Sequence, residues 1–317
     1  MAVTSTDPAL PAAPALPARA DVLAMVAGAA LLSCTSIFVV LAQVGPAVSA
    51  FYRMLFGGVA LLGWVALTGR WRAITRRDAL LALLPALGLA GDLLLWHRSI
   101  LWVGPGVATL LTNFQVFLLA LVGVAAYRER LAPGFWPGMA LALAGLWLLV
   151  GAHWSLFDAA HRLGVWLGLA SCLAYTVYLL SFRRALSGRT ALAPAQFLGL
   201  MSLLCAAALG AWCVIEGDSL ALTTLRGWSA LLALGLLGQV VAWLLIVRSM
   251  PRLPASLVGL LLLLQPALAF VLDVLLFGRA TVALDWCGLA LALAGILLGS
   301  WRPRRPAAAL LAPQDAA

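Results

Sequence analysis

Two stretches that lie 150 residues apart are nearly the same: WPGMALALAG at residues 136–145 and WCGLALALAG at residues 286–295. Leucine and alanine recur by chance in a chain this apolar. The matched Trp136 and Trp286 and the matched glycines therefore carry the comparison. They predict that the chain holds two related halves.

The flanking segments extend the repeat. At the same offset, NFQVFLLALVGVAAYRER (113–130) lies over LLQPALAFVLDVLLFGRA (263–280). At an offset of 147, GDLLLW (91–96) lies over GQVVAW (238–243). The glutamine and tryptophan matches are again the informative ones, because these residues are scarce among the leucines and alanines.

The composition places the chain in a membrane. Hydrophobic residues make up 64% of the 317 residues, charged residues make up only 10%, and the mean hydropathy is +1.07. Soluble domains are roughly 45–50% apolar and about 25% charged. The apolar runs match the roughly 20 residues that a helix needs to cross a bilayer, and they are longer than the roughly 10-residue strands of a membrane barrel. An all-α integral membrane protein is therefore predicted.

Apolar runs between Arg-rich, Pro-rich or Gly-rich breaks predict ten transmembrane helices. The expected spans are 22–43, 47–68, 79–100, 104–126, 134–152, 163–182, 193–215, 228–248, 255–277 and 284–301. Because five helices per half is an odd number, the two related halves must enter the membrane in opposite directions. Such inverted repeats are typical of secondary transporters, whose substrate sites lie near the repeat interface.

The arginines are distributed unequally between the two membrane sides. With the N-terminus inside, fifteen fall in cytoplasmic segments: Arg19, Arg70, Arg72, Arg76, Arg77, Arg128, Arg130, Arg183, Arg184, Arg189, Arg248, Arg252, Arg302, Arg304 and Arg305. Four fall outside or at the outer membrane edge: Arg98, Arg162, Arg226 and Arg279. Because cytoplasmic loops carry an excess of basic residues, both termini are predicted to be cytoplasmic in a multi-pass protein of the plasma (inner) membrane.

All 20 basic residues are arginines, and the chain contains no lysine. The net charge of +9 is therefore assigned to the loops, and no nucleic-acid partner is expected. A Walker A loop needs a Gly-Lys-Ser/Thr ending, so an ATPase of that kind is excluded. His97, His153 and His161 show no clustered ligand spacing, so neither a metal nor another cofactor is expected.

The expected organisation has four parts. Residues 1–20 are rich in Pro and Ala and are expected to be a disordered cytoplasmic tail, and a second cytoplasmic tail is expected over 303–317. The first five-helix repeat is expected over 21–152 and the second over 153–302. The first 20 residues are not expected to be a signal peptide, because they lack early positive charge and the next apolar run is too long.

Three segments resemble a known transporter family in their order and spacing. They are VGPAVSAFYRMLFGGVALL (44–62), VGPGVATLLTNFQVFLLALVGVAAYRERL (103–131) and GLLLLLQPALAFVLDVLLFG (259–278). The second segment ends in the acidic-basic turn Glu129-Arg130. Over residues 22–301 the chain resembles the EamA-type branch of the drug/metabolite transporter (DMT) superfamily.

The resemblance implies ten helices, both termini inside, and export of a substrate by alternating access through a central cavity. One departure is plain. Arg279 stands at the position that matches Glu129, where an acidic residue is usual, so the contribution of that turn is not assumed for the second half.

Asp92 is a candidate for the cavity wall. A carboxylate at a helix centre costs about 2.5–3.5 kcal/mol on insertion scales, so it usually faces a cavity or a partner. Asp92, Trp96 and Ser99 are spaced to share one helix face. This face could bind a cationic group of the substrate or carry a coupling proton, and the alternative is a structural polar contact with a neighbouring helix.

Arg53 is the other costly charge, and its aligned position in the second half is Met201. At 1.5 Å per residue, Arg53 and Asp92 lie about 9 Å and 12 Å below the same membrane face. We therefore hypothesise that they form a gate or binding pair that breaks when a zwitterionic substrate arrives. His97 and Arg98 lie in the last predicted turn of their helix. Snorkelling is expected for Arg98, and either a proton relay or an interfacial position for His97.

Uncharged polar and aromatic residues complete the candidate set: Asn113, Gln115, Tyr175, Gln239, Trp243 and Gln265. The amides could line the cavity or bridge helices, and the aromatic residues could line the cavity or belong to interfacial belts. The spacings Gly134/Gly138 and Gly295/Gly299 would permit close helix approach.

The leading functional prediction is a secondary active transporter that exports a small polar or zwitterionic, amino-acid-like metabolite. Its partners would be a small-molecule substrate and the lipid bilayer, with a coupling proton and a homodimer left open. A broad-specificity drug exporter is the alternative within transport. A membrane-embedded enzyme is the alternative from another class, but no recognisable Asp dyad or Ser-His arrangement supports it.

Overall fold

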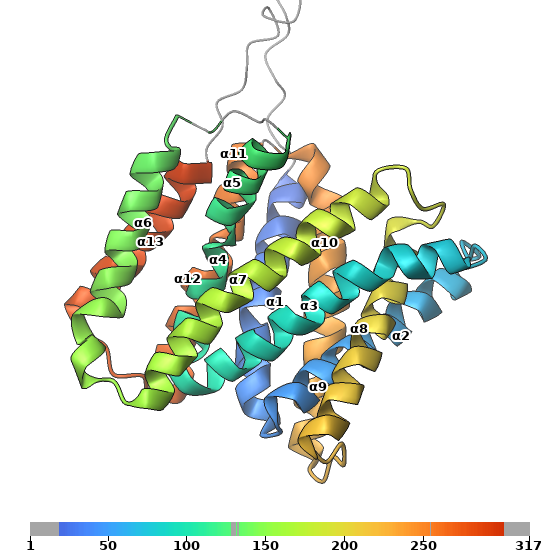
Figure 1. The fold of residues 1–317 in the computed structure, drawn as a ribbon, viewed down its shortest axis with the longest axis horizontal. Coiled ribbons are helices and arrows are strands. Elements are labelled where there is room, and N and C mark those ends of the chain that lie inside the picture. Colours follow the sequence, from blue (N-terminus) through green and yellow to red (C-terminus); the bar gives the residue numbers. More distant parts are fainter. Residues whose placement is uncertain (1–18, 128–130, 132, 254, 301–317) are drawn as a thin grey trace, which may run out of the picture.

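The computed structural model describes residues 19–127, 131, 133–253 and 255–300, and within these residues it is a bundle of helices without strands (Figure 1). The first half contains α1 (Arg19–Ala42), α2 (Pro46–Leu67), α3 (Arg76–Val103), α4 (Pro105–Asn113), α5 (Gln115–Tyr127) and α6 (Phe135–Leu149). The second half contains η1 (Gly151–Leu156), α7 (Ala159–Leu186), α8 (Pro194–Glu216), α9 (Leu225–Ala233), η2 (Leu234–Val241), α10 (Ala242–Ser249), η3 (Met250–Arg252), α11 (Ala255–Leu262), α12 (Leu264–Phe277) and α13 (Ala283–Ser300). The expected terminal tails, except for the first residues of α1, and the Glu129-Arg130 turn lie outside the described residues.

These elements make ten spans. Nine in the described part of the chain are long and apolar enough to cross a membrane, with α4–α5, α9–α10 and α11–α12 each counted as one. The tenth, α6, has 15 residues and is about 22 Å long at 1.5 Å per residue. The protein is therefore a multi-pass membrane protein, and the predicted all-α class with ten helices is confirmed.

Local sequence signals explain where several helices begin and end. Thr75 caps α3 in a reciprocal arrangement with Asp78, which is a capping box. Proline opens both α2 and α8, where its missing N–H costs nothing. Gly217 ends α8 with a φ of +73°, a left-handed conformation that glycine adopts without a steric penalty.

The third and sixth spans are longer than predicted. The third was expected over 79–100 and runs over Arg76–Val103, and the sixth was expected over 163–182 and runs over Ala159–Leu186. The placement of His97 and Arg98 in the last turn of their helix is therefore wrong, because α3 continues past Arg98 for more than one turn. The apolar sequence Ile-Leu-Trp-Val at 100–103 sustains the helix up to Gly104.

The two halves make matching contacts. The helix α3 packs along α7, and the repeat-related contact is made by α1 against α9, η2 and α10. The pairs α2–α8, α4–α12 and α6–α13 each join a helix to its own repeat counterpart. Exchanging the halves therefore maps the bundle onto itself, as two inverted repeats require.

Glycines allow α6 and α13 to approach closely at one edge of the bundle (Figure 1). A Cβ atom added to Gly145 would overlap the backbone of Ala292, and one added to the repeat-related Gly295 would overlap the backbone of Ala142. Only a residue without a side chain fits at either position, which is how small residues hold membrane helices together.

Two spans are interrupted at repeat-related positions. The break between α4 and α5 falls at Phe114, and the break between α11 and α12 falls at Leu263. Pro266 contributes to the second break because it has no N–H for the preceding turn of carbonyls. The breaks agree to within one residue under the alignment, and the matched Gln115 and Gln265 follow them by one and two residues. Broken helices deep in a membrane protein are tolerated where they line a cavity.

Candidate functional site

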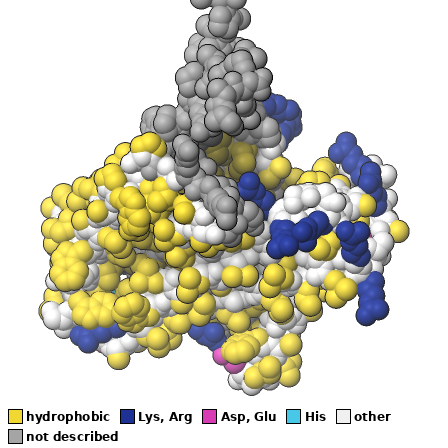
Figure 2. Space-filling model, turned by 45° about the horizontal axis from the view of Figure 1, so that its top comes forward, with side chains coloured by type: hydrophobic (Ala, Val, Ile, Leu, Met, Phe, Trp, Pro, Cys, Tyr) yellow, Lys and Arg dark blue, Asp and Glu magenta, His cyan; other side chains and the backbone are white. Residues whose placement is uncertain are grey.

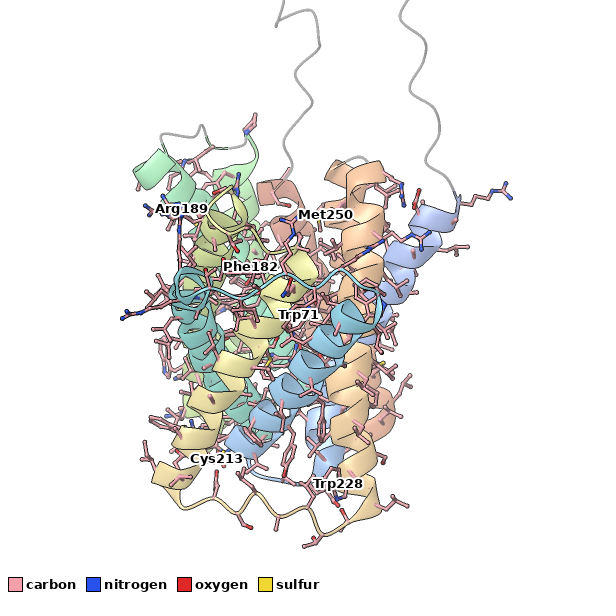
Figure 3. All side chains as sticks on the ribbon, turned by 90° about the vertical axis from the view of Figure 1, so that its right-hand side faces the viewer. Trp71, Phe182, Arg189, Cys213, Trp228 and Met250 are labelled. Carbon is pink, nitrogen blue, oxygen red and sulfur yellow. The ribbon has the colours of Figure 1, made fainter. Side chains whose placement is uncertain are left out.

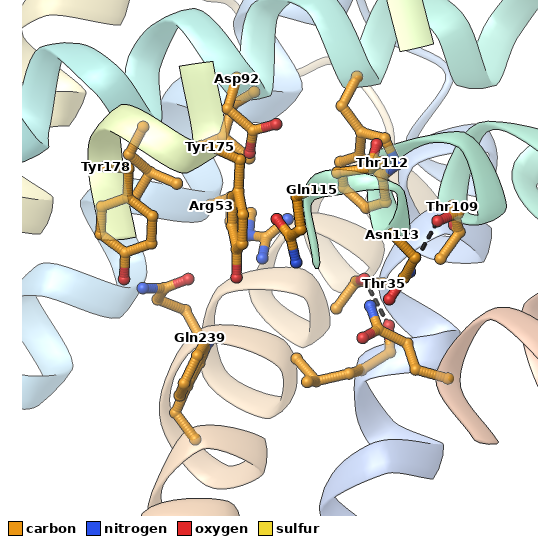
Figure 4. A pocket seen from close by; sticks show the side chains of 16 residues that line it. Thr35, Arg53, Asp92, Thr109, Thr112, Asn113, Gln115, Tyr175, Tyr178 and Gln239 are labelled. Carbon is orange, nitrogen blue, oxygen red and sulfur yellow. Dashed lines mark hydrogen bonds between the residues drawn. The ribbon is translucent and has the colours of Figure 1, made fainter. Parts of the chain in front are cut away.

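A pocket lies between the two repeats and is lined by helices from both of them (Figure 4). Its cavity volume is about 80 Å³, which is space for a few water molecules or a small polar group. Nine of the ten predicted site residues line it: Arg53, Asp92, Trp96, Asn113, Gln115, Tyr175, Gln239, Trp243 and Gln265. The tenth, His97, does not.

The pocket is built from repeat-related pairs. The alignments that relate the two halves match Trp96 to Trp243 and Gln115 to Gln265, and all four side chains line the pocket. The same alignment matches Asp92 to Gln239, also on the wall. The pocket therefore receives matched side chains from both repeats at these three positions, but it carries a carboxylate from the first repeat only.

Arg53 and Asp92 both point into the pocket, yet they do not touch (Figure 4). Among the described residues no ion pair within 4.0 Å joins them, although Arg53 is only 9% exposed and Asp92 only 4%. The guanidinium carbon of Arg53 instead lies 5.6 Å from the ring centroid of Trp96, within the range of a cation–π interaction. The direct pair hypothesised from their matched depth is absent in this conformation, and the guanidinium lies over Trp96, one turn after Asp92 on α3.

Several polar atoms of the pocket have no hydrogen-bond partner. They are Arg53 Nε, Asp92 Oδ1, Trp96 Nε1 and Gln115 Oε1. Buried polar groups are nearly always hydrogen-bonded to protein or water, and each exception calls for a partner. The set contains both donors and acceptors, so it can bind a ligand that carries an anionic and a cationic group.

Two tyrosines and Gln239 form another part of the wall. Tyr175 and Tyr178 are one turn apart on α7 with ring centroids 5.3 Å apart. The hydroxyl of Tyr178 and the amide of Gln239 face each other from two helices of the second repeat (Figure 4). Gln239 lies on η2, a π-helical segment, and such segments are frequent at functional sites. Gly57 permits this approach, because a side chain there would collide with Gln239.

The polar residues of α4 are mostly satisfied within the protein. Asn113 Nδ2 donates to the Thr109 carbonyl at 2.8 Å, and Thr112 Oγ1 lies 2.8 Å from Ser171 Oγ. These threonines and Thr35 line the pocket but were not among the predicted residues. A lone threonine on an apolar helix commonly bonds the preceding turn of its own helix, so the sequence carries no signal that separates these three from any other.

His97 is buried beside the pocket and does not line it. The side chain is 0% exposed, and Nδ1 lies 2.7 Å from Ser49 Oγ, which also donates to the Pro46 carbonyl. His97 is therefore buried within the bundle, and both roles expected for it, a proton relay or an interfacial position, stay predictions. The His97 ring packs against the Trp96 ring, with centroids 5.2 Å apart. Its partner Ser49 lies one turn before Arg53 on α2. These contacts support the two pocket residues Trp96 and Arg53 from outside the pocket.

The end of the bundle that lies away from the termini is closed by contacts across the repeats. Arg98 forms an ion pair with Glu216, so a partner on α8 replaces the expected snorkelling. Tyr52 donates from its hydroxyl to the Leu220 carbonyl at 2.7 Å, and its ring lies 6.1 Å from that of Trp228. These contacts hold the segment between α8 and α9 over the ends of α2 and α3.

Arg279, which departs from the family pattern, joins a second group of contacts at this end. Its Nη1 donates to the Val103 carbonyl at 2.7 Å and lies 3.6 Å from Asp273 Oδ2. Asp273 Oδ2 also accepts from the Gly106 N–H at 3.2 Å. Asp273 and Arg279 therefore tie the second half to the turn between α3 and α4.

Comparison with known sequences supports a transporter. The model of the EamA-like transporter family matches residues 20–151 and 162–301. The uncharacterized transporter YwfM of Bacillus subtilis is 26% identical over 258 residues, which cover 80% of this chain and 84% of that protein. The chloramphenicol-sensitive protein RarD of Pseudomonas aeruginosa is 31% identical over 231 residues, which cover 70% and 71% of the two chains.

A solved crystal structure shares the fold. It superimposes with a TM-score of 0.62 at 20% sequence identity and covers 88% of this chain and 98% of its own. At this identity the likeness concerns the arrangement of the helices alone.

Proposed function

The chain belongs to the EamA-like transporter family, and from that membership we propose that it exports a small zwitterionic, amino-acid-like metabolite by secondary active transport. The pocket between the repeats would be the substrate site, exposed in turn to each side of the membrane. Inverted-repeat transporters place their sites at this interface.

The observation that carries the substrate class is the separation of opposite charges in one small pocket. Asp92 Oδ1 and Arg53 Nε both lack hydrogen-bond partners, and no ion pair within 4.0 Å joins the two side chains. An ammonium group would bind at Asp92, and a carboxylate would bind at Arg53 with help from the Trp96 indole N–H. A charged ligand of this kind neutralises both groups at once.

We propose a proton as the coupling ion, with Asp92 as its carrier. A carboxylate that binds either an ammonium group or a proton makes the two ligands compete for one site. That competition is the simplest form of exchange transport. Because the chain lacks lysine and hence a Walker A loop, the energy would come from a gradient and not from ATP.

Flux into proteoliposomes tests the proposal. The full chain is reconstituted without ATP, a proton gradient is imposed, and uptake of a radiolabelled panel of neutral amino acids, organic cations and organic anions is measured. Gradient-dependent uptake of the zwitterions alone supports the proposal. Strict dependence on added ATP, or preference for singly charged compounds, would overturn it.

A drug exporter is a second candidate, because one relative is named for chloramphenicol sensitivity. Including chloramphenicol in the panel separates the two. A drug exporter would move it and other amphipathic compounds at rates similar to those of the zwitterions, and it would tolerate neutral replacements of Asp92 and Arg53.

We propose that the protein spans a bacterial-type inner membrane with both termini on the cytoplasmic side. A reporter that is active only in the cytoplasm should then work when fused after Arg184 and be silent when fused after Glu216, because one span, α8, separates these positions. The basis for this orientation is the excess of arginine in the segments on one side of the membrane. The opposite pattern of reporter activity would show that the orientation is reversed.

A further inference from the structure

Six arginines gather at one corner of the end of the bundle that carries the termini. They are Arg70, Arg76, Arg77, Arg183, Arg184 and Arg189, and we refer to them as the arginine corner. All six are exposed, and the blue side chains collect on the right of Figure 2, over the ends of the helices. Among the described residues no ion pair joins any of them to a carboxylate.

The corner is a built surface, because the two loops that form it are bonded to each other. The first loop joins α2 to α3 and the second joins α7 to α8, so they come from different repeats. Arg72 Nη1 donates to the Ala191 carbonyl at 2.7 Å, and Gln196 Nε2 donates to the Arg72 carbonyl at 2.6 Å. Thr190 donates to Asp78 Oδ1 at 2.6 Å. These bonds hold together the two loops from which the six arginines project.

The charges in the corner are unfavourably placed in the absence of an anion. Arg76 and Arg77 occupy the first turn of α3, where the free N–H groups already present positive charge and a cation is disfavoured. The nearest acid on that turn, Asp78, is only 4% exposed and accepts hydrogen bonds from Thr75 and Thr190. Among the described residues Asp78 forms no ion pair within 4.0 Å with these arginines.

An aromatic residue marks the depth of the corner. Trp71, in the first loop, is 47% exposed, and Figure 3 shows it and Arg189 on the side of the bundle away from Cys213 and Trp228. Tryptophan is enriched at the level of lipid headgroups. Because Trp71 lies in the same loop as Arg70, we place this loop at the level of the lipid headgroups.

We propose that the arginine corner binds the headgroup phosphates of anionic phospholipids. Clusters of four to eight basic residues beside the end of a membrane helix have this property. The excess of arginine on cytoplasmic loops also orients a membrane protein. That effect does not require hydrogen bonds between the loops, and it does not favour arginines at the start of a helix. The corner bridges the two repeats, so bound lipid would hold together the ends of α3 and α7.

Lipid binding to the detergent-purified full chain tests the proposal, because in a micelle the charges have no part in orientation. Native mass spectrometry compares titrations with phosphatidylglycerol and with phosphatidylcholine. The variant Arg183→Gln/Arg184→Gln is compared with Arg19→Gln/Arg248→Gln, which removes two exposed charges elsewhere at the same end. We expect a preference for phosphatidylglycerol that falls on the order of tenfold in the first variant alone.

Three outcomes decide the matter. Loss of the phosphatidylglycerol preference in a second variant, Arg76→Gln/Arg77→Gln, supports the site when that variant unfolds at an unchanged temperature in detergent. This second variant keeps the test decisive if Arg183→Gln/Arg184→Gln folds poorly. Equal loss in the control variant would overturn it, because the effect would then follow total charge. Displacement of the lipid by inorganic phosphate at similar concentration would also overturn it, since the partner would then be a soluble anion.

Discussion

Asp92→Asn is expected to abolish transport while the protein still inserts into the membrane. The carboxylate is 4% exposed on the wall of the pocket and one of its oxygens has no hydrogen-bond partner, and Asn has the same shape without the charge. Removing the charge deletes the proposed partner of the substrate ammonium group and the proposed proton carrier together. Gradient-driven flux in proteoliposomes measures the effect, and Asp218→Asn removes an acid outside the pocket as the matched control.

A companion variant tests whether the two pocket charges act together. Arg53→Gln should also stop transport, and each single change leaves the other charge uncompensated in a buried site, which is typically worse than removing both. The double variant should therefore insert better than the worse single variant. Near-normal flux by Asp92→Asn would end the functional claim for that residue. Strictly additive effects on insertion would mean that the two charges are independent.

Gly145→Ala and Gly295→Ala are expected to destabilise the protein strongly, although each adds a single methyl group. The new Cβ atoms would overlap the backbones of Ala292 and Ala142, so α6 and α13 must separate. Overpacking of a well-packed contact typically costs about 1–3 kcal/mol, and backbone cannot move aside as a side chain can. The midpoint of thermal unfolding in detergent, with the yield of inserted protein, measures the loss.

Gly63→Ala is the matched control for these two variants. It lies in a helix of the same bundle, but a Cβ atom there meets nothing within 4 Å. Alanine should raise helix propensity at that position and leave stability unchanged or slightly higher. Equal destabilisation by all three changes would mean that glycine is needed for some reason other than the closeness of α6 and α13.

The pocket could be foreseen in part because burial of polar groups in a membrane is costly. Asp92, Gln115 and Gln239 each interrupt an apolar span, and such residues usually face a cavity or a partner. Matching Trp96 to Trp243 across the repeat then predicted that both halves contribute to one site. Thr35, Thr109 and Thr112 could not be foreseen, because a threonine satisfied by its own helix leaves no mark in the sequence.

His97 shows the limit of reading depth from helix ends. The expected end of α3 at residue 100 put His97 in the last turn of its helix, whereas the helix continues to Val103 and His97 is buried beside Ser49. A helix boundary in a sequence is uncertain by several residues. In a membrane protein that error shifts a side chain from water into the core.

The sequence by itself determined the class of the protein, its ten spans, its inverted halves and the positions of the charged residues within the spans. These properties follow from composition, periodicity and the cost of burying charge, and each of these can be read from one span without knowing its neighbours. The tertiary structure alone decided that Arg53 lies over Trp96 and not against Asp92, that α6 and α13 meet through Gly145 and Gly295, and that loops of different repeats join to form the arginine corner. The physical reason is that a contact between two helices depends on where all the others place them, and no single span encodes that position.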